Sequence, residues 1–127
     1  MKVLLKGYIV RSVEFYNKID RETTINISSR VDSTVKYNND ASECDCVLSL
    51  AIKNDGDEEL ISMKVVLESV FTYDNNENKQ DIHKEVSRAA FWQAKAIAHA
   101  LCGTMGIPPF VIPDVDFDNI VEKRIGN

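Results

Sequence analysis

Hydrophobic and polar residues alternate along the first part of the chain. In 3–15 the odd positions are mostly apolar, although Gly7 and Arg11 interrupt the pattern. A β-bulge at Gly7 would accommodate the first interruption. Residues 23–37 alternate more regularly, with one face formed by Ile25, Ile27, Val31, Val35 and Tyr37. A period of two with many β-branched side chains predicts strands that have one apolar and one polar face.

Two further segments, 44–52 and 61–73, alternate in the same way. Polar turns at 38–42 and 54–58 separate the segments, and the Asp55–Gly56 pair in the second turn favours a hairpin. Four strands joined by turns predict an antiparallel meander that occupies roughly 3–73.

The period changes after a polar linker at 74–80. Apolar residues then recur at helical spacing, at Val86, Ala90, Ala94, Ile97, Leu101 and Met105. This spacing predicts one long amphipathic helix, roughly 81–104, that lies across the apolar face of the sheet. Gly103 and Gly106 are expected to end the helix.

The chain after this helix is rich in proline. Pro108, Pro109 and Pro113 exclude helix from 105–113, so we expect an extended segment there. Residues 114–124 have the spacing of a short final helix, and Asp114 and Asp116 suit its N-terminus. The order of elements predicts a single α+β domain over 1–127.

A second stripe on the long helix consists of Arg88, Trp92, Lys95 and His99. One interpretation is a solvated face whose tryptophan packs sideways against the core. The other is a helix contact between subunits, because Trp is enriched at interfaces and the stems of Arg and Lys cover apolar area around it.

Charge and composition exclude several classes of protein. The chain has 127 residues and a net charge of −5, and its basic residues are scattered, which disfavours nucleic acid as a partner. No signal peptide and no stretch long enough for membrane insertion is apparent, so we expect a cytoplasmic protein. The three cysteines are expected to be free thiols, with Cys44 and Cys46 in the core and no metal site.

Motifs for catalysis are absent from the sequence. It has no glycine-rich phosphate loop, no HExxH and no GxSxG motif, so we expect neither an enzyme nor a bound cofactor. It offers apolar surface instead. The 107–112 segment carries Ile107, Phe110, Val111 and Ile112 on a backbone stiffened by proline. A stiff segment loses little entropy on binding, so it is suited to form the wall of a groove, although it also has the composition to pack the edge of the core.

The stretch FWQAKAIAHALCGTMGIPPFVIPDVDFDNI, residues 91–120, resembles the C-terminal part of the export chaperone SecB and its SecB-like relatives. In that family a Leu-Phe-Pro-Tyr-Ala-Arg-like motif opens the helix, and a Phe-Pro-x-Leu-x-Leu-x-Pro-like segment follows it. Phe91, Ala94 and Lys95 fall on the first motif, and residues 107–112 fall on the second. Residues 116–118 fall on an Asn-Phe-Asp helix start, and VEFY at 13–16 suits the end of the first strand.

This resemblance implies a homotetramer, built as a dimer of dimers, that acts as an ATP-independent holdase. Such a protein keeps preproteins unfolded and passes them to the motor ATPase SecA. The implied client-binding residues are Phe71, Phe91, Phe110, Ile107 and Ile112. The resemblance also implies that the stripe of Arg88, Trp92, Lys95 and His99 is the interface between the long helices.

The sequence departs from the family at several positions. Trp92 and Gln93 replace the Pro and Tyr of the first motif, Ser12 and Tyr16 replace acids that contact SecA in the family, and Lys64 replaces a third. Glu14 is the remaining candidate for a SecA-facing acid. These departures suit an alternative function, an adaptor dedicated to a single client, such as an antitoxin, without SecA docking. A small-ligand-binding α+β domain is a second alternative.

Overall fold

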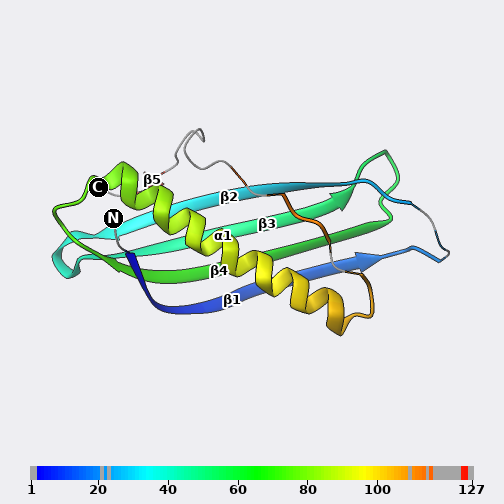
Figure 1. The fold of residues 1–127 in the computed structure, drawn as a ribbon, viewed down its shortest axis with the longest axis horizontal. Helices are drawn as coiled ribbons and strands as arrows, with labels where there is room; N and C mark the ends of the chain where they lie inside the picture. Colours follow the sequence, from blue (N-terminus) through cyan, green and yellow to red (C-terminus); the bar gives the residue numbers. More distant parts are fainter. Residues whose placement is uncertain are drawn as a thin grey trace.

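A computed structural model describes residues 3–20, 22, 24–108, 110–113, 115 and 124–125. Four long strands come first and one long helix follows (Figure 1). The elements are β1 (Val3–Asn17), β2 (Ile27–Asn38), the short 3-10 helix η1 (Asn39–Ala41), β3 (Glu43–Asn54), β4 (Ile61–Tyr73), α1 (Lys79–Thr104) and the two-residue β5 (Arg124–Ile125). The predicted α+β architecture of a four-stranded antiparallel sheet and a long helix is confirmed.

The order of the strands corrects one part of the prediction, the meander. The sheet has the order β1-β4-β3-β2-β5, so β1 pairs with β4 and not with its sequence neighbour β2. Short turns make β2, β3 and β4 consecutive neighbours. Residues 18–26 form a longer connection, which lets the chain pass the end of the sheet to reach its other edge.

The C-terminal part of the chain is described only in places. β5 pairs in parallel with Val35 and Lys36 of β2. The predicted short helix at 114–124 falls mostly outside the described residues, and its last residue, Arg124, belongs to β5.

Two bulges interrupt β1. Its register against β4 shifts between Leu5 and Gly7 and again between Val10 and Ser12, which leaves Lys6 and Arg11 as the extra residues. Each shift inverts the alternation of faces, so the side of β1 that faces α1 stays apolar on both sides of each bulge. The bulge predicted at Gly7 is confirmed, and a second bulge explains how Arg11 fits in the strand.

The core lies between α1 and one face of the sheet. Figure 1 shows α1 crossing this face diagonally, and its contacts are mainly with β3 and β4. The inner faces of β3 and β4 are buried, and so are Cys44, Cys46 and Cys102. Burial raises the pKa of Cys44 to about 12 and that of Cys46 to about 11. The two neighbouring cysteines are therefore protonated core residues, as predicted.

Polar contacts fix both ends of α1. The Asn78 side chain accepts a hydrogen bond from the Gln80 backbone N–H at 2.7 Å and starts the helix. At the other end Gly106 has a φ of +73°, and the Ile107 N–H donates to the Cys102 carbonyl at 3.0 Å. This is a Schellman-type ending, for which glycine is the favoured residue. The chain reverses there and runs back beside the helix.

Candidate binding groove

An open apolar groove of about 570 Å³ lies where the Pro-rich chain after α1 meets one end of the sheet. Most of its lining side chains are aliphatic or aromatic. One part of the lining comes from the β1–β2 connection and the adjoining strand ends: Asn17, Ile19, Glu22, Ile25, Ile27 and Ile61. The other part comes from the chain after α1: Ile107, Pro108, Phe110 and Val111. We call this site the Ile-rich groove.

The β1–β2 connection and the adjoining strand ends form the first wall of the groove. Backbone and side-chain hydrogen bonds hold this wall in place. The Lys18 N–H donates to the Leu60 carbonyl at 2.7 Å, and the Ile19 N–H donates to Asn17 Oδ1 at 3.0 Å. These bonds turn the chain at the end of β1 and aim the connection toward β2. Ile25 and Ile27 then lie on the side of the groove where β2 begins.

Asn54, at the end of β3, supports the turn that leads to Ile61. Its side chain is 5% exposed and makes four hydrogen bonds with the backbone. The amide donates to two carbonyls, and Oδ1 accepts from the N–H groups of Leu60 and Ile61. A buried side chain with all its hydrogen bonds made holds this turn rigidly, and with it the backbone of Ile61.

The second wall is the Pro-rich segment, by which we mean the described residues of 107–113. Ile112 is 4% exposed and anchors the segment in the core, whereas Val111 is 86% exposed. The backbone carbonyl of Phe110 accepts a hydrogen bond at 3.0 Å from Nε2 of His99 on α1. The segment is therefore fixed at several points while an apolar side chain stays in solvent.

The lining defines what the groove can bind. Asn17 and Glu22 are the polar residues among those that line it, and the other eight side chains are apolar. Such a surface gains free energy by covering aliphatic or aromatic groups, because their removal from water is favourable. It is open to solvent, so it can receive part of a longer chain.

The structure separates the five predicted client-binding residues into two groups. Ile107 and Phe110 line the groove. Ile112 is buried beside Val111, and Phe71 and Phe91 are 3% and 0% exposed within the core. Phe71 is on the inner face of β4 and Phe91 is on the buried side of α1, so the helix and sheet cover each other there. These three side chains belong to the core and do not line the groove.

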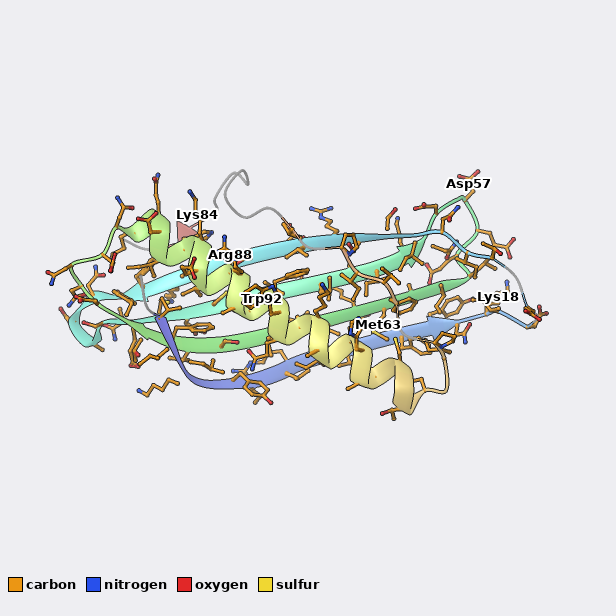
Figure 2. All side chains as sticks on the ribbon, viewed as in Figure 1. Lys18, Asp57, Met63, Lys84, Arg88 and Trp92 are labelled. Carbon is orange, nitrogen blue, oxygen red and sulfur yellow. The ribbon has the colours of Figure 1, made fainter. Side chains whose placement is uncertain are left out.

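The stripe predicted as an interface is divided as well. Trp92 is 58% exposed on α1, and Figure 2 shows it at the middle of the helix, with Arg88 one turn earlier. Arg88 forms an ion pair with Glu85, and the ammonium of Lys95 lies 5.6 Å from the centroid of the Phe91 ring. His99 contacts the Pro-rich segment of its own chain. Trp92 is thus the member of the stripe with a large exposed apolar surface.

A second apolar surface follows the helix-facing side of β1. Its exposed side chains are Leu5, Tyr8, Val10 and Val13. Tyr8 pairs with Ser69 of β4, and the Ser69 hydroxyl hydrogen-bonds to Gln93, the neighbour of Trp92. We call these four side chains of β1 together with Trp92 the β1–Trp92 surface. The sequence pattern did not predict this surface, although it contained one signal for it: an apolar strand at the edge of the sheet.

The outer face of the sheet carries paired charges. Lys6 Nζ lies 2.8 Å from Glu43 Oε1, and Arg11 Nε lies 2.7 Å from Glu68 Oε1. Glu14, the candidate SecA-facing acid, is exposed there and pairs across the strands with Lys64. The described acidic side chains of this face therefore lie close to Lys and Arg side chains.

Asp45 and Glu68 interact on the same face. Burial, followed by the hydrogen bond and charge of Glu68, raises the pKa of Asp45 to about 6. The hydrogen bonds from Asp45 and Arg11 lower the pKa of Glu68. As the pH falls, Asp45 is therefore protonated before Glu68, and Glu68 keeps its negative charge beside Arg11.

Within the described ranges, no group of three or more His, Cys, Asp and Glu side chains is placed to hold a metal ion. No helix among those residues is long and apolar enough to cross a membrane.

Comparison with known proteins gives matches in structure alone. No family model matches the sequence. No curated protein matches it either. The solved structure of the Rv1957 SecB-like chaperone of Mycobacterium tuberculosis, in complex with a ChAD peptide from the Rv1956 HigA1 antitoxin, is similar with a TM-score of 0.66 and 9% sequence identity. The match covers 89% of this chain and 90% of that one.

A second similar structure is a protein of unknown function from Streptococcus agalactiae, with a TM-score of 0.47 and 14% identity over 90% of this chain and 98% of that one. The similarity to the first structure spans both the sheet and the long helix, as the resemblance in sequence implied. The chain therefore has the fold of a SecB-like chaperone.

Proposed function

We propose that this protein is an ATP-independent holdase that binds unfolded or unstructured polypeptide segments in the Ile-rich groove. The observation that carries the proposal is the groove itself, which is open, about 570 Å³ in volume and lined by eight apolar side chains. An extended chain exposes its apolar side chains every second residue, so several can enter an open groove in succession. The SecB-like neighbour, which is described as a chaperone in complex with a peptide, supports this use of the fold.

We also propose that the working form is a homotetramer, a dimer of dimers. Support comes from the β1–Trp92 surface, whose occupant we take to be a second copy of the chain. β1 is a long edge strand with exposed apolar side chains, and such an edge is normally covered. A two-fold axis pairs a strand with its own copy, so one surface can supply both sides of the contact.

The range of clients separates two versions of the proposal. A general holdase in the cytoplasm would serve protein export and deliver preproteins to SecA. An adaptor for one dedicated client is favoured by two observations: the described acids of the outer face stand among Lys and Arg, and the SecB-like neighbour is bound to a peptide from an antitoxin.

Aggregation of chemically reduced α-lactalbumin, followed by light scattering without ATP, tests the holdase. We expect suppression at a stoichiometric ratio of chaperone to client. No protection at several-fold excess would exclude a general holdase. Tight capture of one genetically neighbouring protein, with no protection of α-lactalbumin, would establish the dedicated adaptor instead.

A further inference from the structure

His99 is placed to control the shape of the groove, although it does not line it. The chain reverses at Gly106 and returns beside α1, which brings Phe110 back to a helix residue eleven positions earlier in the sequence. The distance from His99 Nε2 to the Phe110 carbonyl oxygen is 3.0 Å, so the ring donates a hydrogen bond from Nε2–H.

The Pro-rich segment needs such a contact because it makes no sheet or helix of its own. Its described residues have no regular secondary structure, and Pro108 and Pro113 have no backbone N–H to donate. The segment is held at its start by the hydrogen bond from the Ile107 N–H to the Cys102 carbonyl, and near its end by the buried Ile112. His99 contacts the stretch between these two anchors.

The contact also determines where side chains point. The Phe110 carbonyl and the Val111 N–H belong to one rigid peptide plane, so fixing the carbonyl fixes the plane. Phe110 then lies against the groove, and Val111 stays 86% exposed at its rim.

We propose that His99 is a positioning residue that keeps the wall of the Ile-rich groove in its binding conformation through the hydrogen bond to the Phe110 carbonyl. This inference rests on the proposed function. It assigns His99 a role within its own chain, distinct from the interface between helices. A neutral hydrogen bond contributes modestly to a preformed geometry, so its loss weakens client binding by about threefold to tenfold.

The test compares His99→Ala with His99→Gln, whose side-chain amide restores a donor at similar reach. Thr104→Ala is the matched control, because Thr104 is exposed on the same helix and its hydroxyl bonds only to the Ala100 carbonyl among the contacts described for it. Three quantities are measured for each variant: anisotropy of fluorescein-labelled, reduced and carboxymethylated α-lactalbumin, hydrogen exchange at the amides of Val111 and Ile112 without client, and mass by analytical ultracentrifugation.

We expect His99→Ala to bind about threefold to tenfold more weakly and to exchange faster at Val111 and Ile112, with unchanged mass. His99→Gln and Thr104→Ala should match the wild type. Equal binding and equal exchange in His99→Ala would overturn the positioning role and leave the proposed function intact. A smaller mass for His99→Ala would assign the residue to the interface instead. Failure of the wild type to bind the labelled client would overturn the general holdase, whereas the exchange measurement, which needs no client, would still decide whether His99 restrains the segment.

Discussion

Replacing Val111 with Asp tests the groove directly. Val111 lines the groove and exposes 86% of its surface, so the folded chain loses little by the change, less than about 0.5 kcal/mol. Covering a valine side chain fully is worth roughly 1.5 kcal/mol, so a client that covers the exposed part of Val111 gains about 1.3 kcal/mol. That gain corresponds to roughly a ninefold change in the dissociation constant.

Aspartate removes this gain and adds the cost of desolvating a carboxylate, so binding should weaken by at least about tenfold. The assay is the anisotropy titration with labelled, unfolded α-lactalbumin. Asn76→Asp is the matched control, because it adds the same charge in an exposed turn beyond the opposite end of β4. Urea denaturation checks that both variants keep the stability of the wild type. Binding by Val111→Asp within about twofold of the control would refute the assignment of the groove.

Four further predictions concern stability, assembly and reactivity. Asn54→Ala breaks four hydrogen bonds of a 5% exposed side chain and should lower the free energy of unfolding by about 2–4 kcal/mol in urea denaturation; a loss below about 1 kcal/mol would contradict its role in the turn. Trp92→Ala should reduce the sedimenting mass, and an unchanged tetramer would exclude Trp92 from the interface. The pKa of Asp45 in the folded chain is about 6, above its ordinary 3.8, so ionisation of Asp45 opposes folding and stability is lost as the pH rises through this window. Asp45→Asn should therefore stabilise the fold at pH 7 by up to about 1 kcal/mol after solvent screening, and by much less near pH 4; equal gains at both pH values would contradict this. Cys44 and Cys46, with pKa values of about 12 and 11 in buried positions, should not react with a thiol reagent until the chain unfolds, and rapid labelling of the native protein would show that the core opens.

Local periodicity predicted the elements well because a strand or a helix repeats its pattern over many residues. The alternation in 61–73 corresponds to β4, and the helical spacing after 80 corresponds to α1. The partner of β1 was not predictable in this way. Pairing between distant strands depends on the path of the connection at 18–26, and that path has no periodic signal.

The groove was predicted in part for a similar reason. The prolines and apolar run of the Pro-rich segment predict a stiff binding wall, and Ile107 and Phe110 do line the groove. The opposite wall, with Ile19 and Ile25, comes from an irregular connection in which isolated apolar residues show no pattern. The resemblance to SecB implied that Phe71 binds clients, yet its place on the inner face of a strand already indicated burial under the helix.

The paired bulges of β1 have a consequence for insertions and deletions. The first extra residue switches the parity of the positions after it, and the second restores it. The helix-facing residues are therefore odd-numbered at Val3 and Leu5, even-numbered at Tyr8 and Val10, and odd-numbered again at Val13. Deleting Lys6 alone would remove the first bulge and keep Tyr8 and Val10 on the helix-facing side, because Leu5, Gly7 and the residues after them already pair with consecutive residues of β4. Deleting Lys6 and Arg11 together would likewise keep this whole row of apolar side chains on the helix-facing side, but it would remove two ion pairs.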